Sequence, residues 1–211
     1  MMLFSLIKKD FLIAKKYVLL MLILAVVIPL FMLWQLPEFA GILGFMLSAI
    51  FASFMLLQYV YQKEYQFSKA AALLCAAPFS RKTMVLSKYI FFIVIYMICC
   101  LIFWIETLFI YGLRTSNLRL FALTFLATSV FISVYLPVQY KLGYDRAKFA
   151  FIAVFMASPI TLSLLLKTET LNLNFLSMIS PYPVFGIVLI SFFVLAISTY
   201  ISMRIYDKTD L

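Results

Sequence analysis

Residues 89–112 read YIFFIVIYMICCLIFWIETLFIYG and carry one charged side chain, that of Glu106. A membrane-spanning helix needs about 20 mostly apolar residues, and this stretch is long enough to cross a bilayer. The rest of the chain has the same character, since 66% of its 211 residues are apolar and only 12% are charged. A soluble domain is about 45–50% apolar and could not bury so large an excess. The sequence therefore predicts an all-α integral membrane protein.

Five other stretches are also long and apolar enough to span a membrane. Together with the first they predict six transmembrane helices, at about 17–34, 41–61, 89–112, 119–140, 148–166 and 182–203. Residues 1–16 place apolar side chains at helical spacing between lysines, which predicts an amphipathic helix along the membrane interface that bends into the first span. A basic flank that only orients the protein is the alternative. Residues 17–211 then form a single transmembrane domain.

The basic residues are distributed unevenly between the two sides of such a six-span chain. One side receives fourteen of them: Lys8, Lys9, Lys15, Lys16, Lys63, Lys69, Arg81, Lys82, Lys88, Lys141, Arg146, Lys148, Arg204 and Lys208. The other side receives Arg114, Arg119 and Lys167. Loops rich in Lys and Arg stay in the cytoplasm, so we expect both termini and the joints 62–88 and 141–147 to be cytoplasmic. The net charge of +9 then reflects topology and attraction to anionic lipids, and we expect no nucleic-acid partner.

The composition also excludes several kinds of active site. The chain has no histidine, which removes the Ser-His-Asp triad, imidazole bases and HExxH zinc sites. Its five glycines form neither GxxxxGK[ST] nor GxGxxG, so the chain carries no phosphate loop of its own. Cys75 stands alone while Cys99 and Cys100 are neighbours in an apolar run, a pattern that offers no disulfide framework. We expect a non-catalytic chain with no catalytic, cofactor-binding or metal-binding residues.

The joint between the second and third spans is the longest of the predicted cytoplasmic segments. Its Ala70–Leu74 core favours a helix, which Pro78 would end. Ser80 is then placed to cap a second helix that begins at Arg81-Lys82 and runs into the third span. Such a stiff protrusion suits docking on a soluble partner, which would move two spans at once. An orderly turn with no partner is the alternative.

Small residues recur at four-residue intervals in the second span. They are Ala40, Gly44, Ser48 and Ala52. A stripe of small residues lets another helix approach closely, either within the bundle or in a second subunit. The 23 Phe, 13 Tyr and 11 Met either accept varied amphipathic surfaces or simply face lipid and pack.

Glu106 is an acidic residue inside a predicted span. At about 1.5 Å per residue it lies roughly 26 Å along the helix from Tyr89, which places it near the outer interface. It is a candidate outer intramembrane acidic site for cargo or a proton. Pairing with Arg114 or Arg119, or hydration, is the alternative. On the cytoplasmic side, Gly143 and the charges that follow it predict a tight turn between the fourth and fifth spans.

Several separated motifs resemble small six-span ABC-2-type ABC transporter permeases. In the joint between spans two and three the resembling residues are Glu64, Leu73-Leu74, Pro78-Phe79-Ser80-Arg81-Lys82 and Ser87-Lys88-Tyr89. Lys8 to Phe11 and Lys141 to Ala147 also look like that family. The joint departs from the family pattern at Phe67, Ala70 to Ala72 and Cys75, where polar residues are common. Among these permeases, the chain is most similar to the subunits that export amphipathic phenol-soluble modulins.

This resemblance implies a permease subunit of an ATP-driven exporter in a bacterial cytoplasmic membrane. A separate ABC ATPase, present in two copies, would hold ATP and Mg and receive a coupling helix around Glu64–Ala77. The implied ATPase-coupling residues are Glu64, Phe67, Leu73, Leu74, Pro78, Arg81 and Lys82. A second permease chain, identical or different, would complete the path for an amphipathic peptide such as a phenol-soluble modulin or a bacteriocin. The alternative is a stand-alone membrane channel or scaffold without an ATPase partner.

The topology is tested by introducing single cysteines into a variant that lacks the native ones. Cysteines at Ser68, Leu142 and Thr209 should be shielded from membrane-impermeant thiol reagents in intact cells, because all three positions are predicted to be cytoplasmic. A cysteine at Thr115 should react. Labelling of position 68 from outside would contradict both the six-span topology and the cytoplasmic coupling segment.

Overall fold

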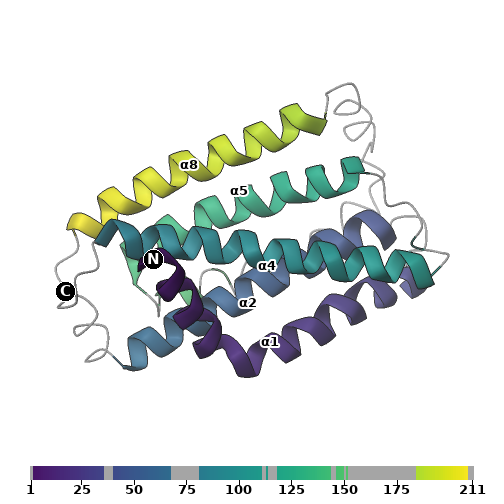
Figure 1. Ribbon diagram of the computed structural model, residues 1–211, viewed down its shortest axis with the longest axis horizontal. Coiled ribbons are helices and arrows are strands. Elements are labelled where there is room, and N and C mark those ends of the chain that lie inside the picture. The colour runs from purple at the N-terminus through teal and green to yellow at the C-terminus, as the bar shows by residue number, and fades with distance from the viewer. Residues whose placement is uncertain are drawn as a thin grey trace.

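The computed structural model of the chain describes residues 2–35, 40–67, 81–110, 113, 118–143, 146–149, 151 and 184–208. The long elements in this part of the chain are all helices. They are α1 (Met2–Gln35), the π-helix η1 (Ala40–Gly44), α2 (Phe45–Gln66), α4 (Arg81–Phe109), α5 (Leu118–Leu142) and α8 (Val184–Lys208). Figure 1 shows the long helices lying side by side in an elongated bundle.

Within these ranges, five helical segments are long and apolar enough to cross a membrane: Leu3–Trp34, Ala40–Gln66, Lys82–Phe109, Leu118–Leu142 and Val184–Asp207. They contain five of the six predicted spans almost completely, which confirms the prediction of an α-helical membrane protein. The remaining predicted span, 148–166, falls mostly outside the described residues, so the count of six stays a prediction.

The direction in which α8 runs is relevant to the number of membrane spans. Phe125, Ser133 and Tyr140 follow one another along α5, and they contact Phe192, Ser198 and Tyr206 of α8 in the same order. The two helices therefore run parallel, and α8 begins at the end of the bundle opposite to the end of α5 (Figure 1). This direction agrees with the further span predicted between them.

The N-terminal segment and the first span form one continuous helix. Figure 1 shows α1 bending along its length, so that its first turns run at an angle to the remainder. The first turns are thus helical and continuous with the first span, while a separate amphipathic helix over residues 1–16 stays a prediction. Its position along the membrane surface stays a prediction.

The small-residue stripe of the second span packs inside the chain. Ala40, Ser48 and Ala52 are buried, and Gly44 lies against α1. A Cβ atom on Gly44 would stand 2.9 Å from the Cα of Pro29, a separation too short for any side chain. Of the two roles predicted for the stripe, the structure supports packing within the bundle. These residues are covered and are not available to a second subunit.

Aromatic side chains fill the core between α2, α4 and α5. Phe45 stacks on Phe103 with ring centroids 4.6 Å apart and meets Phe121 edge-on at 5.3 Å. Phe54 meets Tyr135 at 5.2 Å nearer the other end. Such pairs add to the apolar burial, so a large share of the aromatic residues serve packing.

Two local predictions about helix ends are confirmed. Helix α4 begins at Arg81, as the Pro78 and Ser80 signals indicated. Gly143 ends α5 with φ 78°, and its N–H donates to the carbonyl of Gln139 at 3.0 Å. Glycine is favoured at such a position because it reaches positive φ without steric cost.

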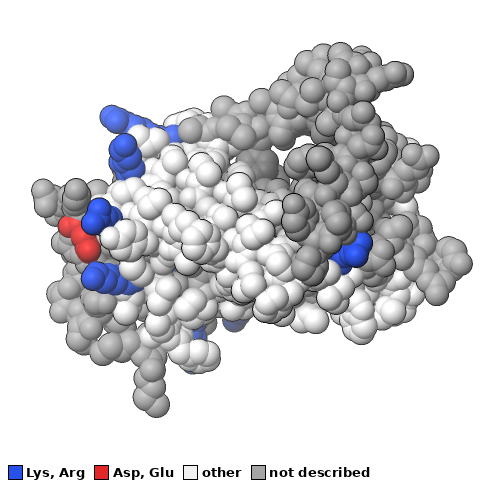
Figure 2. Space-filling view, turned by 90° about the horizontal axis from the view of Figure 1, so that it is seen from above, with Lys and Arg blue, Asp and Glu red and all other residues white. Residues whose placement is uncertain are grey.

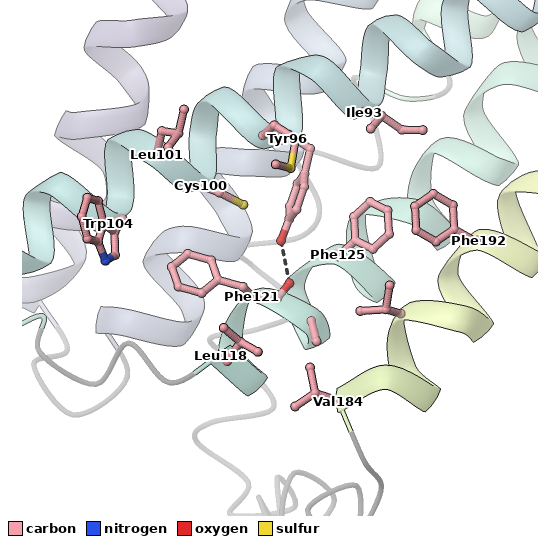
Figure 3. Close-up of a pocket in the computed structure, with 13 residues that line it drawn as sticks. Ile93, Tyr96, Cys100, Leu101, Trp104, Leu118, Phe121, Phe125, Val184 and Phe192 are labelled. Atoms are coloured by element: carbon pink, nitrogen blue, oxygen red, sulfur yellow. Dashed lines mark hydrogen bonds between the residues drawn. The ribbon is translucent and has the colours of Figure 1, made fainter.

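The two ends of the bundle differ in charge. Figure 2 shows a face whose middle is almost free of charged side chains, with Lys, Arg and acidic residues gathered mainly at one end. At the opposite end, an apolar groove lies between α4, α5 and α8 (Figure 3).

Candidate functional site

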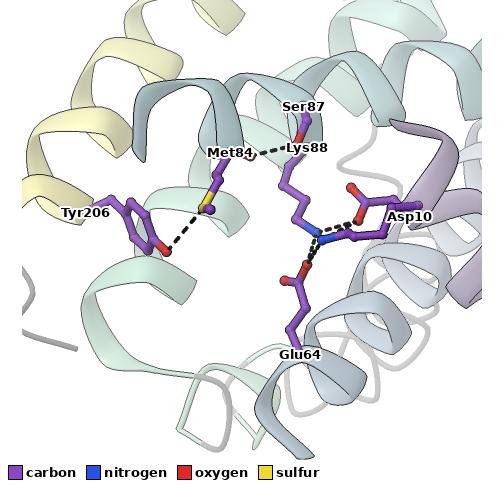
Figure 4. A network of polar contacts seen from close by, with 7 residues as sticks. Asp10, Glu64, Met84, Ser87, Lys88 and Tyr206 are labelled. Carbon is purple, nitrogen blue, oxygen red and sulfur yellow. Dashed lines mark hydrogen bonds and ion pairs between the residues drawn. The ribbon is translucent and has the colours of Figure 1, made fainter. Parts of the chain in front are cut away.

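Four charged side chains meet at the charged end of the bundle (Figure 4). The Lys88 ammonium lies 3.0 Å from Asp10 Oδ1 and 2.7 Å from Glu64 Oε1. The Lys9 ammonium lies 2.8 Å from the same Glu64 oxygen and 3.4 Å from Asp10 Oδ1. Each cation therefore contacts each anion, and the four formal charges cancel. We refer to Lys9, Asp10, Glu64 and Lys88 as the four-charge network.

The network joins three helices at the borders of the predicted coupling segment. Glu64 lies in the last turn of α2, and Lys88 lies two turns into α4. Residues 68–80 connect these two positions and lie outside the described part of the chain. Lys9 and Asp10 come from the N-terminal part of α1. The two ends of the coupling segment are thus tied to each other and to α1.

Burial makes this pairing obligatory. The side chain of Asp10 is 0% exposed and that of Lys88 is 5% exposed, whereas Glu64 and Lys9 are 24% and 29% exposed. A buried charge is costly unless it is paired and hydrogen-bonded. Lys88 satisfies this condition only while α1 and α2 both present their carboxylates to α4.

Aromatic rings extend the network toward α5 and α8. The Lys88 ammonium stands 5.2 Å from the ring centroid of Tyr61, within cation–π range. The ring of Tyr61 contacts that of Tyr140 at 5.8 Å, and Tyr140 contacts Tyr206 at 5.3 Å. The Tyr206 hydroxyl returns to α4, where it donates to the Met84 sulfur at 4.0 Å.

A second polar cluster ties α4 to α8 near this end. The hydroxyl of Tyr89, the residue after Lys88, lies 2.7 Å from Ser198 Oγ and 2.8 Å from Ser202 Oγ. Ser198 also donates to the backbone carbonyl of Ser133 in α5 at 2.8 Å. The first turns of α4 therefore contact α1, α2 and α8, and α8 in turn contacts α5.

This arrangement is suited to holding helices and transmitting force. Within the described ranges, no three His, Cys, Asp or Glu side chains lie close enough together to hold a metal ion. The network and its tyrosines instead connect both borders of residues 68–80 to α1, α5 and α8.

A family model described as "ABC-2 family transporter protein" matches residues 5–207. The chain belongs to this ABC-2 family. Neither a comparison with curated proteins nor one with solved structures found a significant match. Family membership makes the chain a membrane permease component of an ABC transporter, a kind of subunit that is generally non-catalytic and works with ABC ATPase partners.

The residues predicted to couple this ABC-2 permease to an ATPase fall into three groups. Glu64 is held in the four-charge network. Phe67 follows α2 with its ring 61% exposed, and Lys82 is exposed in the first turn of α4, which begins at Arg81. Leu73, Leu74 and Pro78 lie outside the described residues. The exposed Phe67 and Lys82 stand on either side of the coupling segment, where a docking partner would reach them.

Sequence reasoning did not identify Lys9, Asp10 and Lys88 as partners of Glu64. The sequence places Lys9 and Lys88 among the cytoplasmic basic residues, and Asp10 enters only within the family-like motif Lys8 to Phe11. A usable signal was present, because Lys88 precedes a continuous apolar run within the same helix. Ionisable residues in such positions are costly unless another charge lies nearby.

Glu106 lies at the other end of this permease, one turn before the end of α4. Its side chain is buried, and neither carboxylate oxygen has a hydrogen-bond partner among the described residues. Arg114, one predicted partner, lies outside those residues. The role of Glu106 as an outer acidic site stays a prediction.

Removing one charge of the four-charge network should destabilise the protein more than removing an opposite pair of charges. Lys88→Gln should destabilise the protein by about 3 kcal/mol, because it leaves the buried Asp10 with only the longer contact to Lys9. Thermal unfolding of the purified protein in detergent measures this loss. The double variant Lys88→Gln/Asp10→Asn should be more stable than Lys88→Gln alone, since it leaves the balanced Lys9–Glu64 pair in place.

The control is Lys82→Gln in the same helix, whose exposed side chain should change stability by less than about 0.5 kcal/mol. Equal unfolding temperatures for Lys88→Gln and Lys82→Gln would show that the network does not support the fold.

Proposed function

We propose that this ABC-2 permease couples ATP hydrolysis by a separate ABC ATPase to the export of an amphipathic peptide. The observation that carries the coupling is the four-charge network, which links both borders of the segment 68–80 to α1. The ATPase would bind this segment, so its movement would reach three helices through one buried joint.

The docking surface is proposed to be apolar. Phe67 is exposed at its near border, and Leu73 and Leu74 lie within the segment itself. Interfaces are enriched in aromatic and apolar residues at their centres, with charges at the rim. Leu73 and Leu74 would fill a groove of the ATPase while Arg81 and Lys82 flank it. ATP and Mg would be held by the ATPase, of which we propose two copies.

The orientation follows from the distribution of charge. In the described residues, the end that holds the network also holds all of the lysines and every arginine except Arg119. We place this end in the cytoplasm of a bacterial cell, with both termini on the same side, because positive residues are retained there.

A second permease chain, identical or different, is proposed to complete the transport path. The most hydrophobic 18-residue windows of α1 and α8 are only 17% and 22% buried, against 61% for the second span. The exposed apolar faces of these outer helices offer area to a second permease or to lipid. We propose the first span and the predicted fifth span, 148–166, as candidates for the contact between the two permease chains, because the small-residue stripe of the second span is covered within the chain.

The cargo class rests on the resemblance to phenol-soluble modulin exporters. An amphipathic peptide needs an apolar surface beside a polar one. Large exposed aromatic side chains on the outer helices, among them Phe31, Trp34, Phe185 and Phe193, fit such a cargo. A bacteriocin or another antimicrobial peptide has the same chemistry.

The docking of the ATPase is tested by the double variant Leu73→Asp/Leu74→Asp. Full burial of each leucine contributes about 1.5–3 kcal/mol, so two buried aspartates should abolish co-purification of the ATPase with the tagged permease. Peptide export should stop while the permease remains inserted in the membrane. The matched control is Lys167→Ala, on the predicted far side, which should be nearly silent. Normal ATPase binding and export by the double variant would favour a stand-alone channel or scaffold.

The variant Glu64→Gln tests whether movement is transmitted from the ATPase to the permease, separately from binding of the ATPase. Lys88 keeps its contact with Asp10 in this variant, so the complex should still assemble. Because the link between α2 and α4 is weakened, peptide-stimulated ATPase activity should fall severalfold. Arg81→Gln should act in the same way, and Lys63→Gln, one position before Glu64, serves as the control. Unchanged stimulation in Glu64→Gln would exclude the network from coupling.

A further inference from the structure

An apolar groove with a volume of about 430 Å³ lies where α4, α5 and α8 meet, away from the four-charge network. Ile93 and Trp104 mark its extent along α4, while Leu118 and Val184 line it from the first turns of α5 and α8. Figure 3 shows these side chains arranged around a common space. The groove is thus part of the opposite half of the bundle.

The dimensions of the groove select its occupant. From Ile93 to Trp104 the rise along α4 is about 16 Å, at 1.5 Å per residue. No charged residue lines this length, and the groove lies between three helices long and apolar enough to span a membrane, so its surroundings are lipid hydrocarbon. Carbon atoms in contact stand about 3.5–4.0 Å apart, so one extended hydrocarbon chain fits.

The length of the groove and the polarity of its lining agree with one acyl chain as the occupant. A length of about 16 Å is close to half of the roughly 30 Å hydrocarbon core of a bilayer, which is the depth of one leaflet. Tyr96 brings a hydroxyl to the groove, but that hydroxyl already donates to the Phe121 carbonyl at 2.6 Å and lies 2.9 Å from Thr124 Oγ1. It therefore requires no polar group from an occupant.

A basic residue adjoins the groove lining in the first turn of α5. Arg119 follows Leu118 directly, and its side chain is exposed. In the described part of the chain it is the basic residue of this end of the bundle. An arginine at the end of a span extends toward the headgroup region, where its guanidinium can contact phosphate oxygens.

We infer that the groove between α4, α5 and α8 binds an anionic phospholipid, with one acyl chain along Ile93–Trp104 and the phosphate beside Arg119. The lipid would join three helices at the end of the bundle that the four-charge network does not reach. This site is separate from the segment proposed to bind the ATPase.

The two tryptophans of the chain provide a direct test. Trp104 lines the groove, whereas Trp34 is 81% exposed near the end of α1, at the same end of the bundle. The full chain carrying Trp34→Phe reports on the groove alone, and the chain carrying Trp104→Phe reports on the general lipid surface. Both are reconstituted in mixed phosphatidylcholine and phosphatidylglycerol vesicles, with brominated acyl chains on one lipid or the other at equal mole fraction.

We expect brominated phosphatidylglycerol to occupy the groove about fivefold more than brominated phosphatidylcholine, measured by quenching of Trp104 fluorescence. This factor corresponds to the contribution of about 1 kcal/mol from one basic residue near anionic lipid. Trp34 should be quenched equally by both lipids. Adding Arg119→Gln to the Trp34→Phe chain should remove the preference while leaving quenching by the acyl chains. Ala122→Phe, which fills the groove, should remove the preference as well.

Four results would overturn the inference. Equal quenching of Trp104 by the two lipids would show that the groove does not select an anionic headgroup. An equal preference at Trp34 would mean a general enrichment of anionic lipid around the protein. Quenching of Trp34 without quenching of Trp104 would show that a protein segment or a peptide fills the groove. A preference that survives Arg119→Gln would exclude the assigned phosphate position.

Discussion

A lysine enclosed by membrane helices needs carboxylates around it, and Lys88 finds them on two other helices. Its side chain is 5% exposed and lies within 3.0 Å of oxygens from both Asp10 and Glu64. The cost of an unpaired buried charge is high enough that α1, α2 and α4 must meet in this register. The tyrosines and serines beside Lys88 extend the same junction to α5 and α8. The position of every described span at this end therefore depends on the pairing of one ammonium group.

Helix α4 connects this junction to the opposite half of the bundle. It carries Lys88 near its start, the stripe from Ile93 to Trp104 that borders the groove, and the buried Glu106 near its end. A helix keeps its backbone hydrogen bonds within itself, so it moves through lipid as a stiff element. In the proposed mechanism, a displacement that the ATPase applies to the start of α4 therefore changes the environment of the groove and of Glu106. The start of α4 is linked to α1 and α2 by electrostatic contacts, and the far half of α4 is held by apolar packing.

The amino-acid sequence was sufficient for the features that depend on local chemistry. Apolar length predicted the spans, Pro78 and Ser80 predicted the start of α4, and Gly143 predicted the turn after α5. The network escaped prediction because its contacting partners are up to 78 positions apart, and hydropathy does not specify which helix faces which. Counting Lys88 with the cytoplasmic basic residues treated it as hydrated, although it is buried. The groove was missed for the same reason, since its lining comes from three helices whose order in space no periodicity reveals.

A buried ionic joint is an unusual choice if stability is the aim, because apolar side chains of similar size often stabilise a core more. The advantage of an ionic joint is that each charged group can exchange one partner for another while it stays paired. In the four-charge network all four opposite-charge distances fall between 2.7 and 3.4 Å, so both cations already contact both anions. A shift of α1 by about an ångström against α2 and α4 can lengthen one contact and shorten another without leaving any charge unpaired. An interdigitated apolar joint would resist such a shift, since close-packed interiors tolerate few displaced atoms. In the proposed mechanism, a junction that both holds three helices and lets them slide during a transport cycle is therefore better built from paired charges than from packed hydrocarbon.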